Sequence, residues 1–193
     1  MIVITDLEVG GVPLHLHRLT LALRERGYRP SVVSLAPPGP VTKMLQDDGI
    51  PVDSCQACCG WDLRVIPRLA RLMGTERPDV VHAILFHANL AARFAAPRAD
   101  ISDSRVLCEI QTVEVDQRWH LTVDRWTQSR CRLTIGNSPS VIEHLATHGG
   151  IDRRRLRLVR RILCRDQCTR SCAPDSPAEP RHWPRQLCAQ HLL

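Results

Sequence analysis

The sequence has no apolar run long enough to span a membrane. Its amino terminus also lacks an export signal, which would place a long apolar stretch after a basic region. Residues 2–4 indicate a short buried strand instead. We therefore expect a cytoplasmic protein, and without export the nine cysteines are not expected to form a disulfide framework.

Lysine is almost absent, because Lys43 is the only one, so the net charge of +6 comes from arginine. This excess is mild for 193 residues. It is compatible with phosphate-bearing partners, and it leaves peripheral membrane contact open. No aromatic or groove-reading motif accompanies the basic residues, so we do not expect nucleic-acid binding.

The opening segment, residues 2–13, carries an informative pattern. An apolar run is followed by a polar turn that contains Gly10 and Gly11, and Pro13 stands where a first helical residue fits. Glycine lets another molecule approach the backbone, and a helix start favours an anion such as phosphate. The turn lacks the spaced three-glycine fingerprint of dinucleotide-binding proteins. A phosphate loop and a plain tight turn are equally good interpretations of this stretch alone.

Strands and helices are predicted to alternate along residues 1–159. This alternation predicts an α/β protein with a Rossmann-like, doubly wound parallel sheet that is covered on both faces. The expected strands are residues 2–4, 31–35, 51–53, 80–83, 105–110, 132–136 and 156–159. The expected helices are residues 13–26, 40–48, 62–77, 88–96, 119–129 and 138–148.

The pattern stops after Val159. Residues 160–193 contain six arginines, four prolines and four cysteines without a sustained apolar period. Such a composition is typical of disorder. We interpret the segment as a low-order tail that arose from a reading-frame change or a premature end in a GC-rich gene. The predicted organisation is one domain over residues 1–159 and a disordered tail over residues 160–193.

Four segments of the predicted domain resemble the amino-terminal domain of family 4 glycosyltransferases, which have the two-domain GT-B fold. They are Thr5–Gly11, Leu21–Tyr28, Arg77–Ala83 and Leu133–Val141. The resemblance runs from Ile2 to Val159 and implies one half of a GT-B fold. It implies that this half holds a sugar, lipid or polysaccharide acceptor. The other half of such enzymes binds a nucleotide-sugar donor, and no cofactor or metal beyond that substrate is implied.

The resemblance also supplies candidate site residues. It favours a phosphate or acceptor loop at Gly10 and Gly11. Gln111 stands where many family members have a histidine, and Glu114 lies close by; these two are the candidate catalytic residues. Glutamine cannot act as a general base. Retaining members of the family are thought not to depend on one.

Further candidates lie at predicted strand ends, where doubly wound sheets bind ligands. They are His82 and His87 for ligand binding, and Asn137 and Ser138 for acceptor contact. Each has a simpler interpretation: a core histidine, an exposed loop histidine, or a helix cap in the case of Ser138. A third group clusters at a predicted strand end: Glu109, Gln111 and Glu114. We slightly favour the interpretation that these three are solvated loop residues.

We favour the acceptor-side domain of a glycosyltransferase, with little or no activity alone because the donor domain is absent. One alternative is a non-catalytic module that binds a sugar, a phosphate or a protein. Another is a cysteine-based metal or redox protein, suggested by Cys55, Cys58 and Cys59. A lone cysteine pair lacks the four ligands that zinc needs, so we expect no metal site and favour coincidence.

Overall fold

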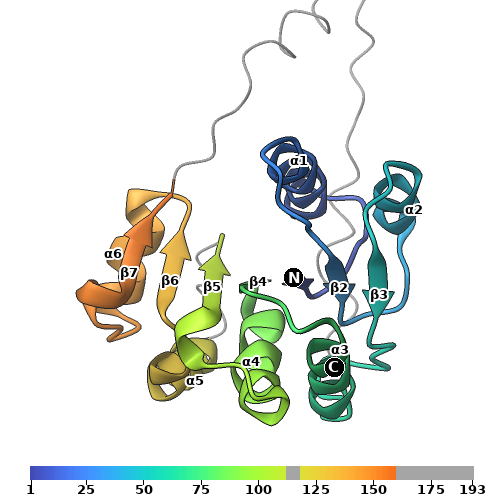
Figure 1. The fold of residues 1–193 in the computed structure, drawn as a ribbon. Helices are drawn as coiled ribbons and strands as arrows, with labels where there is room; N and C mark the ends of the chain where they lie inside the picture. Colours follow the sequence, from blue (N-terminus) through green and yellow to red (C-terminus); the bar gives the residue numbers. More distant parts are fainter. Residues whose placement is uncertain (112–117, 160–193) are drawn as a thin grey trace, which may run out of the picture. The chain divides into compact units, whose positions relative to one another are not determined.

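The computed structural model describes residues 1–111 and 118–159. In this part, parallel strands form one seven-stranded sheet in the order β3-β2-β1-β4-β5-β6-β7 (Figure 1). The predicted α/β class with a Rossmann-like parallel sheet is therefore confirmed. The strands are β1 (Ile2–Ile4), β2 (Val32–Ser34), β3 (Val52–Ser54), β4 (Val81–Ile84), β5 (Val106–Ile110), β6 (Leu133–Gly136) and β7 (Leu156–Leu158).

The strand order reverses between β1 and β4. Ile2 of β1 is in register with Val32 of β2 on one side and with His82 of β4 on the other. The chain builds the sheet outward to β3, then returns to start the second half beside β1. At such a reversal the loops leave in opposite directions, so the carboxyl ends of β1 and β4 border the crevice where these sheets bind ligands.

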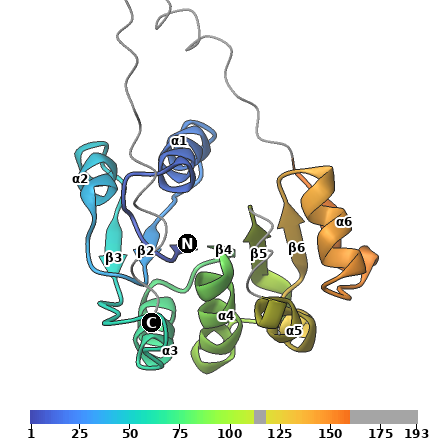
Figure 2. The same ribbon diagram turned by 180° about the vertical axis from the view of Figure 1, so that it is seen from behind.

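Helices cover both faces of the sheet. α1 and α2 lie together on one side of the strands, and α3, α4 and α5 lie on the other (Figures 1 and 2). The helices are α1 (Gly11–Glu25), α2 (Pro40–Asp47), α3 (Val65–Glu76), α4 (Phe86–Ala95), α5 (Arg118–Thr127) and α6 (Pro139–Thr147). Short 3-10 turns occupy Ala96–Ala99, Asp103–Arg105, Gln128–Arg130 and Arg153–Arg155.

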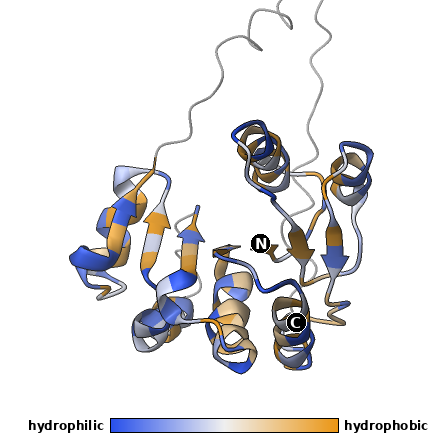
Figure 3. Cartoon of the chain, in the orientation of Figure 1, coloured by the Kyte–Doolittle hydropathy of each residue, from blue (hydrophilic) through white to orange (hydrophobic). Residues whose placement is uncertain are grey.

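The two faces of the strands have separate cores. Ile4 packs with residues of α1 and α2, whereas Val3 packs with residues of α3 and α4. A smaller cluster joins α6 and β7 to Leu121 of α5. All three residues of β1 are buried, with side chains on both faces of the sheet, which explains the continuous apolar run at the start of the sequence. Hydrophobic residues accordingly colour β2, and hydrophilic residues mark the outer sides of the helices (Figure 3).

Three helix starts differ from the sequence predictions by two residues or more. α1 begins at Gly11, two residues before Pro13, and α4 begins at Phe86, two residues before the predicted start. α3 begins at Val65, so Pro67 lies in its first turn, where a missing N–H breaks no helical hydrogen bond. The side chain of Asp62 orders the preceding loop instead of capping α3.

Two predictions fall outside the described residues. They are the candidate catalytic residue Glu114 and the low-order tail, residues 160–193. Within residues 1–111 and 118–159, none of the helices combines the length and the apolar character that a bilayer crossing needs.

Candidate functional site

The glycine turn lies at the carboxyl end of β1, beside the strand-order reversal. Gly10 precedes α1 in an extended conformation, and no side chain caps the first turn of the helix. A Cβ atom added at Gly10 would meet only Pro13 Cδ, at an ordinary 3.7 Å, and one at Gly11 would meet nothing within 4 Å. The packing of the described residues therefore does not require either glycine. Both leave the N–H groups at the helix start open to a ligand.

A third glycine, Gly39, which the sequence analysis did not single out, packs against the backbone of this turn. The amide nitrogen of Val41 donates to the carbonyl oxygen of Leu7 at 3.1 Å. A Cβ atom at Gly39 would lie 2.5 Å from that same oxygen, so only glycine fits there. The Pro37-Pro38-Gly39-Pro40 run before α2 was the available signal, because it marks a loop with special backbone demands. Gly39 thus fixes the position of the turn.

Polar side chains gather where β4 and β5 end. Nε2 of His82 lies 2.9 Å from Oε2 of Glu109, and Nε2 of Gln111 donates to Oε1 of Glu109 at 2.7 Å. Burial raises the pKa of Glu109, but the hydrogen bonds from His82 and Gln111 and the charges of His82 and His15 outweigh it. The net result is a pKa below the ordinary value of this carboxyl. Glu109 is thereby held as a buried carboxylate.

The interpretation of Glu109 and Gln111 as solvated loop residues is wrong. Glu109 is 7% exposed and Gln111 is 6% exposed. Gln111 uses its amide nitrogen on Glu109, and its backbone oxygen accepts from Nδ2 of Asn137 at 2.8 Å. Its side-chain oxygen has no hydrogen-bond partner among residues 1–111 and 118–159. A buried amide oxygen in this state is suited to accept a hydrogen bond from a ligand hydroxyl.

The junction between β4 and α4 supports this cluster. Leu85 has φ 77° and ψ 161°, a conformation that residues other than glycine rarely adopt, and its amide nitrogen donates to the carbonyl oxygen of Glu109 at 3.0 Å. Asn89, one turn into α4, hydrogen-bonds the backbone of Glu109 as well. The sequence analysis missed both residues. Asn89 was detectable as a polar residue in a helix otherwise rich in small apolar side chains.

Two of the remaining predicted residues lie at the next strand end along the sheet. Asn137 follows β6 and holds the backbone of Gln111, so it joins the cluster through its side chain. Ser138 caps α6, since its Oγ accepts from the amide nitrogen of Val141 at 3.3 Å. The capping interpretation of Ser138 therefore accounts for its described contacts.

His87 lies apart from the carboxylate, in an aromatic cluster at the starts of α4 and α5. Its ring meets Phe86 edge-on at 5.3 Å and His120 edge-on at 5.8 Å. The other members of this aromatic cluster are Trp61 and Trp119. The interpretation of His87 as an exposed loop histidine is wrong, because His87 lies in α4 and is half-buried.

The cysteines of the Cys55–Cys59 motif differ in burial. Cys55 is buried, whereas Cys58 and Cys59 are exposed. Burial raises the pKa of the Cys55 thiol to about 11, which makes it a poor nucleophile and a poor metal ligand at neutral pH. In the part of the chain that the structure describes, no group of three or more His, Cys, Asp or Glu side chains is arranged to hold a metal ion.

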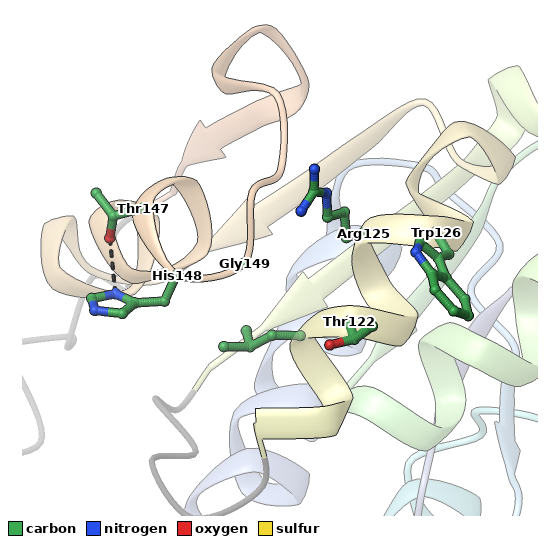
Figure 4. Close-up of a pocket in the computed structure, with 7 residues that line it drawn as sticks. Thr122, Arg125, Trp126, Thr147, His148 and Gly149 are labelled. Atoms are coloured by element: carbon green, nitrogen blue, oxygen red, sulfur yellow. Dashed lines mark hydrogen bonds between the residues drawn. The ribbon is translucent and has the colours of Figure 1, made fainter.

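A hollow of about 390 Å³ lies elsewhere, between α5 and α6 (Figure 4). Arg125 and Trp126 border it from α5, and His148, hydrogen-bonded to Thr147 at 2.9 Å, borders it from the end of α6. None of the predicted site residues lines this hollow, so the candidate site is the strand-end cluster and the glycine turn.

Solved structures with a similar chain path are glycosyltransferases of the GT-B type, and the fold is therefore one half of that architecture. HepE of Anabaena, solved with UDP, shares 16% identity at a TM-score of 0.67, over 82% of this chain and 43% of its own. A glycosyltransferase of Rickettsia africae shares 15% at 0.64, over 89% and 48%. MurG of Acinetobacter baumannii shares 16% at 0.51, over 72% and 41%.

The sequence model of Glycosyltransferase Family 4 matches residues 9–162, and the chain belongs to this family. No curated protein matches the sequence. The chain spans less than half the length of each of the three solved relatives.

Proposed function

We propose that residues 1–159 form the acceptor-side half of a glycosyltransferase, which moves a sugar from a nucleotide sugar to an acceptor hydroxyl. Family membership supports the reaction class. The observation that carries the acceptor role is the buried side-chain oxygen of Gln111, left without a partner among the described residues beside the Glu109 carboxylate. A hydroxyl group supplies the donor that this oxygen needs.

The residues have separate roles in this proposal. Gly10 and Gly11 leave space for the donor phosphates at the start of α1. Glu109 orients the amide of Gln111, so that its oxygen is turned toward the acceptor. Asn137 positions Gln111 through the backbone.

The donor is proposed to be a nucleotide sugar. HepE has been solved with UDP and with UDP-glucose, at 16% and 18% identity to this chain. Because this chain spans 43% of HepE, we infer that residues 1–159 transfer little or no sugar unless a donor-binding half is supplied.

A fusion tests the proposal directly. Residues 1–159 are joined to the donor-binding half of HepE, and UDP release from UDP-glucose is measured with water as the acceptor. We expect release from the fusion and little or none from the full chain alone. A Gln111→Ala fusion should lose most of the activity, whereas Trp126→Ala, at an exposed position on α5, should keep it.

Two results would contradict the proposal. A folded fusion that releases no UDP removes the assignment as a transferase half and leaves a sugar- or phosphate-binding module. Robust turnover by the full chain alone refutes its dependence on a second half. The origin of residues 160–193 is tested separately by reading the genomic DNA beyond codon 159 in the other frames, where a donor-domain sequence is expected.

A further inference from the structure

The aromatic cluster at the starts of α4 and α5 is built as a stack with one buried and one open end. Phe86 lies face to face with His120 at 3.6 Å between ring centroids, and Trp119 meets Phe86 edge-on at 5.2 Å. Trp61 stacks on Trp119 at 5.1 Å with 23° between the ring planes. Contacts of this kind stabilise aromatic pairs beyond simple burial.

Exposure rises along this stack. Phe86 and His120 are 7% and 5% exposed, Trp119 is 39% exposed and Trp61 is 68% exposed. Indole has a large apolar surface, so leaving Trp61 in water forfeits much of the free energy that its burial would give. The fold thus holds two indole rings at the surface on a buried aromatic base.

The loop that carries Trp61 is ordered on both sides of it. The side chain of Asp62 is 3% exposed and accepts hydrogen bonds from the amide nitrogens of Cys58, at 3.2 Å, and Arg64, at 3.1 Å. Nε of Arg64 also donates to it at 2.8 Å. The guanidinium of Arg68 donates to the carbonyl oxygen of Cys55 at 2.9 Å. Trp61 is therefore presented from a pre-organised loop, which lowers the entropy cost of binding a ligand.

The buried base of the aromatic stack is joined to the candidate site through the chain. Phe86 directly follows Leu85, whose amide nitrogen is bonded to the carbonyl oxygen of Glu109. Trp119 lies in the first turn of α5, the helix that follows β5 and Gln111. The base of the stack is thus one residue away from a backbone contact of Glu109, whose neighbour Gln111 has a buried amide oxygen suited to a hydroxyl donor.

We propose that the Trp61–Trp119 pair is the platform on which a pyranose ring of the acceptor stacks. The electron-rich face of indole attracts the positively polarised C–H groups on one face of a pyranose. In this proposal the hydroxyl groups at the rim of the acceptor sugar bind the polar cluster. An alkyl chain would cover the indoles equally well but would leave the amide oxygen of Gln111 unsatisfied, which favours a carbohydrate acceptor over a lipid tail.

This inference rests on the proposed function, because only that function makes the bound sugar an acceptor. Its test measures sugar binding and needs no catalysis. The full chain is mixed in turn with methyl glycosides of glucose, galactose, mannose and N-acetylglucosamine, and saturation transfer from protein to sugar is measured by NMR. We expect transfer to the ring protons of at least one glycoside. Trp61→Ala should reduce it by about fivefold or more, and Trp61→Phe should retain part of it.

Trp126→Ala is the matched control, because Trp126 is a 79% exposed tryptophan on α5 outside the aromatic stack. It should leave the transfer unchanged. Thermal unfolding should be nearly unchanged in Trp61→Ala, whose side chain is mostly exposed, so that loss of transfer is not loss of folding. Octyl β-glucoside serves as a second probe, and transfer should again favour its ring protons over its alkyl protons.

Three results would overturn the inference: no transfer to any of the glycosides, transfer undiminished in Trp61→Ala, or transfer chiefly to the alkyl protons of octyl β-glucoside, which would assign the surface to a lipid. These outcomes are distinct from those of the fusion assay. Sugar binding at Trp61 without UDP release would keep the platform and reject the transferase, and the opposite pair of results would do the reverse.

Discussion

The side-chain amide of Asn89 hydrogen-bonds both backbone polar groups of Glu109. Nδ2 donates to the carbonyl oxygen at 3.1 Å, and Oδ1 accepts from the amide nitrogen at 3.2 Å. Asn89 is fully buried. A helix side chain therefore acts on β5 much as a neighbouring strand does, and it holds the carboxylate of Glu109 at a fixed place on the sheet edge.

Glu109→Gln is expected to destabilise the protein at neutral pH by about 2 kcal/mol, because it removes the charge that His82 and Gln111 stabilise. The pKa of Glu109 is lower in the folded than in the unfolded protein, so this stabilisation is present above the unfolded value of 4.5. It is lost as the pH falls through the folded value. Urea unfolding at several pH values measures the difference.

Glu143→Gln provides the control, since Glu143 forms an exposed pair with Arg153 and should change stability by only a few tenths of a kcal/mol. A difference between wild type and Glu109→Gln that stays constant down to acid pH would contradict the assignment of Glu109 as a stabilised carboxylate.

The glycines of the candidate site should separate into two kinds. Gly39→Ala forces a Cβ atom against the backbone of Leu7 and is expected to cost about 1–3 kcal/mol in urea unfolding. Gly10→Ala meets only an ordinary contact and should change stability by less than about 0.5 kcal/mol. In the fusion with the HepE donor half, Gly10→Ala should nonetheless lower UDP release about tenfold. Full activity of that variant would show that no ligand approaches Gly10 closely.

At Leu85 a glycine substitution should be less destabilising than an alanine substitution, which reverses the usual order. Both substitutions remove the same side-chain packing, but Leu85→Ala keeps a side chain at φ 77° and Leu85→Gly does not. Release of this strain is worth about 1–3 kcal/mol, more than the entropy cost of glycine. We expect Leu85→Gly to unfold at higher urea concentration than Leu85→Ala. The opposite order would mean that the backbone is unstrained in solution.

A buried ion pair joins α4 to α5. Arg93, with no exposed surface, donates to the carboxylate of Asp124 and, at 2.9 Å, to Oγ1 of Thr127. Arg93→Met leaves the Asp124 charge buried without this partner and should cost about 3–5 kcal/mol. The double variant Arg93→Met/Asp124→Leu should recover much of that loss, as denaturant unfolding would measure. Additive losses in the double variant would refute the coupling between these two charges.

The layered sheet was predictable from the sequence because each element carries its own signal. The run Ile2-Val3-Ile4 is apolar at every position, as a strand buried on both faces requires. Pro139 after Ser138 marks a helix start, and α6 begins there. These signals are local, so they can be recognised in the sequence without knowing which elements pack against each other.

The arrangement at the strand ends was less predictable because it depends on distant partners. Burial of Glu109 follows from its contacts with His82 and Asn89, which belong to other elements. Trp61 and Trp119 are far apart in sequence, and the strands that precede them, β3 and β5, are separated by three other strands in the sheet, so no local pattern predicts the contact between their rings. The polar residues Asn89 and Arg93 in a helix of small apolar residues were the one local signal of buried polar contacts, and it did not name their partners.

The position of Leu85 has a consequence for how this protein can diversify. Its amide is bonded to Glu109 and its neighbour Phe86 is the base of the aromatic stack, so any shift of that peptide unit moves both regions together. The segment around Trp61 has its own anchor in Asp62 and touches the aromatic stack through the contact of Trp61 with Trp119. New sugar preferences can therefore arise by exchange of this one short segment, while the machinery at the strand ends is inherited unaltered.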